Sequence, residues 1–252
     1  MLARFKEPSW NNPVVRFLDV DGKDVIERRD GVWSTQGLVA RMIAALEAEA
    51  RPVPEYLSVV ETESNAAGLS RATFAMHCFW EGEAKLGALD GVVDTRAAFL
   101  EGKEVVEVTF DPAEISYSAL IDEAQSLQCA STVYARDEAQ LEIAQERARD
   151  RARLSRENPK DAPPSDQRYH LRQSILHYLP LTPMQAMKLN SALARTEDPS
   201  AFLSPRQRGL VKKLEATART RPHLLKGLDP PRSNEQLGDY AERLEKKLSE
   251  SE

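Results

Sequence analysis

Short apolar runs and helix-forming runs alternate between Arg71 and Ala135, and their order constrains the fold more than any other feature of the chain. The apolar runs have the length of strands, and the runs between them have helical periodicity or turn composition. In chain order the pattern predicts a strand over 71–76, a helix over 79–89, strands over 92–99 and 104–110, a helix over 117–127 and a strand over 132–135. We therefore expect a mixed domain of the α+β class.

The flanking segments complete the predicted architecture. The central β-α-β-β-α-β order is the ferredoxin-like arrangement. Beyond it, a charged run from Asp137 to Glu157 and two capping motifs that begin at Leu181 and Leu203 indicate further helices. The expected parts are an N-terminal hairpin and helix fragment over 1–52, a linker over 53–69, the ferredoxin-like core over 70–140 and a helical C-terminal region over 141–252.

The N-terminal fragment has the pattern of a β-hairpin followed by one helix. Val14 to Leu18 and Asp24 to Glu27 are extended runs around a glycine-containing turn, and Ser34 or Thr35 can cap the helix. So small a fragment cannot bury both faces of its own sheet. With a proline before its first strand, it resembles the C-terminal half of a thioredoxin-like domain, whose redox half would precede Met1. The alternative is an extension that pairs with the sheet of the next domain.

Cys78 is the chemical centre of the predicted core. It stands where the first strand passes into the first helix. At a helix N-terminus, unpaired N–H groups and the helix dipole favour a thiolate, which is the reactive form of cysteine. Phe79 and Trp80 could form an apolar wall beside it for a small hydrophobic group. The alternative is an inert cysteine buried against these aromatic rings.

Several blocks around Cys78 carry a resemblance to a known family. They are His77-Cys78-Phe79-Trp80 with Glu83 three residues beyond the Trp, Leu89 to Arg96, Glu104 to Pro112, and Ile115-Ser116-Tyr117 with Leu120. In this order they resemble the peptide methionine sulfoxide reductases of the A class over roughly residues 70–140. The family's core agrees with the ferredoxin-like order predicted from the residues.

The resemblance implies a chemistry for three groups of residues. Cys78 would attack the sulfoxide sulfur as a thiolate, leaving methionine and a cysteine sulfenic acid. Glu104 falls on the position of the family's catalytic Glu and would protonate the departing oxygen, provided that burial keeps it protonated. Phe79 and Trp80 would line a pocket for the S-methyl group. Without the resemblance, the pattern around Glu104 indicates a solvated acidic residue on a strand edge.

The sulfenic acid must then be resolved by a second thiol or by an external reductant. Cys129 is the only internal candidate, since the chain has two cysteines. It lies on the same side of such a fold as Cys78, and a disulfide would need the two Cα atoms within about 7 Å. A thioredoxin-like protein or domain would be a natural electron donor. The alternative for Cys129 is a small hydrophobic residue in the core.

The chain also departs from the family's pattern. His77 replaces the Gly before the nucleophile, and the segment that carries an oxygen-binding Tyr is reduced to Leu100-Glu101-Gly102-Lys103. The block that supplies an Asp and a second Tyr is replaced by the stretch around Cys129, and the C-terminal resolving cysteines are absent. We therefore expect a peptide-methionine (S)-S-oxide reductase acting in protein repair, with two alternatives. One is a thiol reductase for another oxidised substrate, and the other is a catalytically silent module whose helical tail binds a partner.

Composition excludes several other classes of function. A net charge of -6 argues against nucleic-acid binding, and no apolar run reaches the length of a membrane span. Two cysteines cannot form a disulfide framework, and no Cys/His cluster has zinc spacing, so we expect neither a metal nor a cofactor. The first residues lack the apolar core of a signal peptide, which leads us to expect a cytoplasmic protein.

Overall fold

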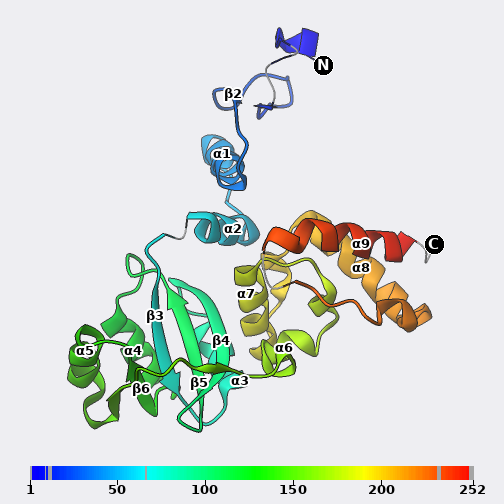
Figure 1. Ribbon diagram of the computed structural model, residues 1–252. Coiled ribbons are helices and arrows are strands. Elements are labelled where there is room, and N and C mark those ends of the chain that lie inside the picture. Colours follow the sequence, from blue (N-terminus) through cyan, green and yellow to red (C-terminus); the bar gives the residue numbers. More distant parts are fainter. Residues whose placement is uncertain (1, 9, 11–12, 66, 232–233, 250–252) are drawn as a thin grey trace. The chain divides into compact units, whose positions relative to one another are not determined.

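Figure 1 shows the computed structural model of the chain, which describes residues 2–8, 10, 13–65, 67–231 and 234–249. The chain divides into two compact units, residues 1–65 and 66–252. What would precede Met1 lies outside the described residues. The expected domain limits at residues 52, 69 and 140 therefore stay predictions, as does the thioredoxin-like origin of the first unit.

The first unit begins with a short 3-10 helix, Leu2–Phe5, and then forms the predicted hairpin. Strands β1 (Val14–Val15) and β2 (Arg29–Asp30) pair antiparallel, and Leu18 bridges Asp24 closer to the turn. Asp19 shapes the turn, because its Oδ1 accepts hydrogen bonds at 2.9 Å from two backbone N–H groups. The two strands form a sheet of their own in the described part of the chain. The alternative in which the hairpin pairs with the next domain's sheet stays a prediction, as does the thioredoxin-like one.

Two helices complete the first unit, one more than expected. Helix α1 (Thr35–Ala48) is capped by Ser34, whose Oγ accepts the N–H of Gly37 at 3.0 Å. Helix α2 (Glu55–Asn65) occupies most of the predicted linker over 53–69, where no helix was expected. The prolines that suggested a linker precede the helix, where a missing N–H costs nothing. Its apolar side packs on α1, with Val39, Ile43 and Leu57 buried in a shared cluster.

The second unit is built on a six-stranded sheet. Its strands are β3 (Ser70–Ala75), β4 (Val92–Leu100), β5 (Lys103–Phe110), β6 (Thr132–Ala135), β7 (Ala152–Leu154) and β8 (Lys160–Asp161). Their order across the sheet is β7-β6-β3-β5-β4-β8. The four central strands, β6, β3, β5 and β4, pair antiparallel with one another and connect as β-α-β-β-α-β. This is the ferredoxin-like core predicted from the sequence, and the α+β fold class is confirmed.

A two-residue turn joins β4 to β5 and sets their register. Leu100 pairs with Lys103, and both turn residues have positive φ, 51° at Glu101 and 73° at Gly102. Such a turn matches the right-handed twist of the flanking strands. Because the hairpin is this tight, it places Glu104 directly opposite Phe99 at the start of β5.

Helices α3 (Phe79–Leu86) and α4 (Tyr117–Ser126) are the two crossover helices of the core. Helix α3 packs on β4 and β5. Gly82 permits this close approach, since a Cβ there would clash with the Met76 Sδ and stand 3.1 Å from a methyl group of Val106. Helix α4 is capped by Ser116 and buries one side, including Leu120 and Ile121. Helix α5 (Glu138–Ala148) packs on α4 and β6.

Two short strands interrupt the region that was expected to be helical. Within the charged run from Asp137 to Glu157 the α-helix ends at Ala148, where Arg149 turns the chain with a φ of 55°, and a 3-10 helix over Arg149–Arg151 follows. Residues 152–154 then pair parallel to β6, and residues 160–161 pair antiparallel to β4. These edge strands are too short to show a period, so only the neighbouring strand selects their conformation. Figure 1 shows this part of the chain running along the sheet before it enters the last helices.

The remainder of the second unit is helical, as predicted. It contains α6 (Tyr169–Arg172), α7 (Pro183–Ala194), α8 (Pro205–Thr220) and α9 (Leu237–Ser249), with short 3-10 turns between them. The two predicted capping motifs are confirmed, because Thr182 with Gln185 and Ser204 with Gln207 form reciprocal capping boxes. Buried leucines and Tyr240 hold these helices together. Helix α7 also packs on α3 and β4, which brings this region to the core.

Candidate functional site

Cys78 is the N-cap residue of α3, as the sequence predicts. Its backbone is extended, with φ −141° and ψ 113°, and its C=O accepts the N–H of Gly82 at 3.1 Å. The strand before it ends at Ala75, so a short connection carries the chain out of the sheet. The Cys78 side chain is partly exposed and forms no disulfide. The thiol therefore lies at the positive end of a helix and within reach of solvent.

Glu104 lies beside Cys78 although 26 positions separate them in the sequence. Its Oε2 accepts a hydrogen bond from the N–H of Phe79, the residue after Cys78, at 2.9 Å. Its backbone C=O accepts the N–H of Met76 at 3.1 Å, which ties the start of β5 to the end of β3. Glu104 is neither fully buried nor fully exposed. The Glu104 carboxyl group therefore lies at the same helix end as Cys78, while the catalytic roles of the two residues stay predictions.

The two aromatic residues after Cys78 have different surroundings. Phe79 is 5% exposed and packs edge-on against Phe99, with ring centroids 5.4 Å apart. Trp80 is partly exposed and stacks on Tyr169, with centroids 4.1 Å apart and ring planes 14° from parallel. Phe79 and Trp80 were both predicted to form an apolar wall, but only Trp80 lines a cavity beside Cys78.

That cavity has a volume of about 280 Å³ and adjoins Cys78. It is lined by Cys78, Trp80, Glu81, Ala84, Lys85, Tyr169, His170, Ala194 and Arg195. Its two cationic side chains are paired, Lys85 with Glu81 at 2.5 Å and Arg195 with Glu197 at 2.6 Å. The walls are thus mainly apolar and aromatic, and they come from α3 together with α6 and α7.

Cys129 lies in the connection after α4 and is 3% exposed. Its Sγ contacts the C=O of Leu127 at 3.5 Å, and the same C=O accepts a hydrogen bond from Lys85 Nζ at 3.1 Å. Burial raises the pKa of the Cys129 thiol to about 11, so it is protonated near neutral pH. It does not line the cavity at Cys78. Its role as a resolving thiol stays a prediction.

Glu83 belongs to the block around Cys78 that carries the resemblance, but the sequence did not show its burial or its contact with the C-terminal region. It is wholly buried, and its Oε2 accepts the backbone N–H of Arg168 at 2.8 Å. Burial raises the pKa of its carboxyl group to about 7. Arg168 in turn pairs with Asp94 on β4 at 2.6 Å. These contacts attach the C-terminal region to α3 immediately before Tyr169, which no motif in the sequence had marked.

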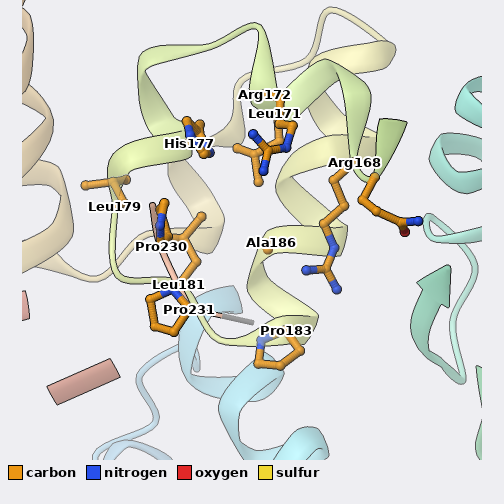
Figure 2. A pocket seen from close by; sticks show the side chains of 11 residues that line it. Arg168, Leu171, Arg172, His177, Leu179, Leu181, Pro183, Ala186, Pro230 and Pro231 are labelled. Atoms are coloured by element: carbon orange, nitrogen blue, oxygen red, sulfur yellow. The ribbon is translucent and has the colours of Figure 1, made fainter. Parts of the chain in front are cut away.

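A second, smaller cavity of about 70 Å³ lies among the C-terminal helices (Figure 2). Figure 2 shows that the basic side chains of Arg168 and His177 stand on opposite sides of it rather than converging on one point. Desolvation lowers the pKa of His177, which favours its neutral form. Neither Cys78 nor Glu104 lines this cavity, so we assign no chemistry to it.

In the part of the chain that the structure describes, no group of three or more His, Cys, Asp and Glu side chains is arranged to hold a metal ion. No helix there combines the length and the apolar character needed to cross a membrane.

Comparison with known proteins gives partial matches. No protein-family model matches the chain. It is 38% identical over 71 residues to the peptide methionine sulfoxide reductase MsrA of Methanoculleus marisnigri, and 36% identical over 80 residues to that of Methanothermobacter thermautotrophicus. These matches cover 21% and 25% of this chain, and 43% and 47% of the relatives. The chain thus spans somewhat less than half the length of these relatives.

A solved structure is also similar to this chain. The methionine sulfoxide reductase A of Corynebacterium diphtheriae is 17% identical with a TM-score of 0.36, covering 51% of this chain and 86% of that one. The relationship itself rests on the curated sequences, which include an MsrA from Rhodospirillum centenum at 33% identity over 111 residues. From these sequence matches, the chain is a divergent relative of the MsrA peptide methionine sulfoxide reductases.

Proposed function

We propose that the chain is a thiol-dependent peptide-methionine (S)-S-oxide reductase with Cys78 as its nucleophile. One observation carries the proposal: Glu104 bonds to the N–H of the residue that follows Cys78, at 2.9 Å. A nucleophile and a proton donor must both reach one sulfoxide group, and this bond keeps the two side chains at the same helix end. The relationship to MsrA sequences supports the same reaction.

The proposed first step uses only these two side chains. The Cys78 thiolate attacks the sulfoxide sulfur while Glu104 gives a proton to the sulfoxide oxygen. The S–O bond breaks, and the hydroxyl group passes to Cys78 as a sulfenic acid. The substrate sulfur is reduced by two electrons to the thioether, and the Cys78 sulfur is oxidised by two electrons. Trp80 supplies an apolar surface for the group carried by that sulfur.

The sulfenic acid then has to be reduced by a thiol, with loss of water and formation of a disulfide. We propose Cys129 as the internal thiol and a thioredoxin-like protein as the donor that follows. Since Cys129 is buried and protonated, its attack requires the connection after α4 to open and expose it. An external thiol acting directly on Cys78 is the alternative, favoured by the partial exposure of Cys78.

Turnover of a methionine sulfoxide peptide by the reduced protein tests the proposal. We expect a stoichiometric burst of methionine without reductant and continued turnover with dithiothreitol, both lost in Cys78→Ser. Glu104→Gln should keep the bond to Phe79 but lose the proton, lowering the burst rate by about 100-fold or more. Glu101→Gln is the matched control, because Glu101 lies on the same hairpin and bonds instead to the Tyr134 hydroxyl at 3.2 Å.

Cys129→Ser separates the two routes of resolution. If Cys129 resolves the sulfenic acid, the variant keeps its burst but loses turnover supported by thioredoxin. A wild-type protein without any burst would contradict the reductase assignment. Measured alkylation of Cys78 would then distinguish the two remaining functions, because a thiol reductase for another substrate reacts quickly at neutral pH and a silent module does not.

A further inference from the structure

We propose that Tyr169, in the C-terminal region, is a specificity-determining residue of the Cys78 site, and that Glu83 is the residue that positions it. The inference deepens the proposed function and rests on it for the identity of the reaction. Tyr169 lies outside the blocks that resemble the reductase family, so the family pattern does not account for it. Its placement is a property of this chain's own tertiary structure.

The contact between Tyr169 and Trp80 makes a two-ring wall. Their rings lie nearly parallel with centroids 4.1 Å apart, so Tyr169 covers one face of the indole. Both residues line the cavity that adjoins Cys78. A substrate group can therefore meet the free surfaces of this pair, but it cannot insert between the rings. Tyr169 in this way limits the width of the cavity next to the thiol.

The backbone before Tyr169 is held in place by buried contacts. Arg168 has a φ of 50°, an unfavourable conformation for a residue other than glycine, which must be offset by its surroundings. Its N–H donates to the wholly buried Glu83, and its guanidinium pairs with Asp94 at 2.6 Å. On the other side, the N–H of Leu171 donates to Asn190 Oδ1 of α7 at 3.1 Å. Tyr169 is thus fixed from both directions.

A further contact anchors α7 on the core. Lys188 Nζ donates to the backbone C=O of Leu89, just beyond α3, at 3.0 Å. The end of α7 supplies Ala194 and Arg195 to the cavity, so this contact also fixes that side of the cavity relative to Cys78. The cavity is a feature of the assembled second unit and not of the reductase-like core by itself.

The cavity's size and charge indicate the class of substrate. About 280 Å³ lies at the lower end of ligand pockets in proteins, which suits one amino-acid side chain better than a larger cofactor. Its cationic side chains are already paired with Glu81 and Glu197, so an anionic group would gain little there. The geometry therefore points to a single neutral side chain as the group that enters the cavity.

Alkylation of Cys78 measures the width of the cavity without requiring turnover. In a Cys129→Ser background Cys78 is the sole thiol, and its rates with iodoacetamide and with a bulky naphthyl iodoacetamide can be compared. We define the reagent ratio as the Cys78 alkylation rate with the bulky reagent divided by the rate with iodoacetamide. We expect Tyr169→Ala to raise this ratio by about tenfold, because the Tyr169 ring no longer limits the width of the cavity. Tyr169→Phe keeps the stacked ring and should leave the ratio unchanged. Tyr178→Ala, a tyrosine of the same region that lines neither cavity, is the control for general loosening.

Glu83 is tested by rescue. Glu83→Ala removes the acceptor of the Arg168 N–H and should change the reagent ratio in the same direction as Tyr169→Ala. Glu83→Gln retains a carbonyl acceptor and should restore the wild-type reagent ratio. If Glu83 acts through packing alone, the two variants should differ in stability but have the same reagent ratio. Far-UV circular dichroism identifies any variant that fails to fold.

Peptide reduction gives the second readout. If the chain is the proposed reductase, Tyr169→Ala should raise KM for a methionine sulfoxide peptide by about tenfold, with a smaller effect on kcat. An unchanged reagent ratio in folded Tyr169→Ala would overturn the assignment of the wall even if peptide turnover is normal. A changed ratio in a protein without turnover would support the wall and refute the reductase, so the two failures are distinguishable.

Discussion

At the scale of single residues, the most unusual group is the carboxyl of Glu83. It is excluded from solvent, and its hydrogen bond to Arg168 only partly offsets the cost of burying a charge. Its pKa is therefore raised from 4.5 to about 7 in the folded protein. A proton that the unfolded chain would release is retained by the folded chain across this pH range.

The raised pKa of Glu83 makes stability depend on pH. Because the folded state binds the proton more tightly, this group stabilises the fold fully below about pH 4.5, and the contribution is lost as pH rises through about 7. The difference in unfolding free energy between wild type and Glu83→Gln should therefore shift by on the order of 2–3 kcal/mol between pH 5 and pH 8. Urea unfolding of both proteins at the two pH values measures it. An equal stability difference at both values would show that Glu83 ionises normally.

At the scale of secondary-structure elements, the hairpin of β4 and β5 decides where Glu104 lies. A one-residue change of register would turn the Glu104 side chain to the other face of the sheet, away from Phe79. The tight turn at Glu101 and Gly102 prevents this, and Gly102 adopts a φ of 73° without steric cost. The turn is thus a condition for the hydrogen bond between Glu104 and the N–H of Phe79.

Two glycine substitutions test this account of the turn. Gly102→Ala should destabilise the protein by about 1 kcal/mol, because alanine disfavours positive φ. A Cβ at Gly102 would meet no atom within 4 Å, so steric contact cannot cause the loss. Gly209→Ala is the matched control, since it is equally uncrowded but lies inside α8, and it should stabilise by up to about 1 kcal/mol. Chemical denaturation of the two variants should give effects of opposite sign, and the same sign in both would contradict the explanation.

At the scale of the whole molecule, every residue of the candidate site comes from the second unit. Cys78 and Glu104 belong to the reductase-like core, whereas Tyr169 and Arg195 belong to the C-terminal region. The first unit has a small apolar cluster of its own around Val39 and Leu57. Chemistry at Cys78 is therefore expected to depend on the integrity of residues 66–252 as one folded body.

A fragment of residues 66–252 should accordingly fold and keep the Cys78 alkylation rate of the full chain. By contrast, a fragment that ends before Arg168 loses Tyr169, the N–H that donates to Glu83 and the contacts of α7, so its cavity should be open to bulky reagents. Comparing the two fragments by reagent ratio and circular dichroism tests both expectations. If the fragment of residues 66–252 folds but its Cys78 alkylation rate differs from that of the full chain, a part of the site belongs to the first unit.

Much of the core was predictable because it depends on local chemistry. Strand and helix periods predicted the β-α-β-β-α-β order, and hydroxyl residues followed by glutamine predicted the capping boxes of α7 and α8. The position of Cys78 at a helix N-terminus follows from the residues on either side of it. Local signals are ambiguous elsewhere, as at Pro54, which precedes helix α2 although prolines also mark linkers.

The sequence by itself therefore determined the order of the core elements, the ends of several helices and the position of Cys78 at a helix N-terminus. Only the tertiary structure decided that Tyr169 covers Trp80, that Glu83 is buried against Arg168, that Cys129 is enclosed, and that residues 152–154 and 160–161 are strands. The physical reason is the range of the interactions. Periodicity and capping act within a few residues, whereas burial, stacking and edge pairing join segments far apart in the chain and leave no local pattern.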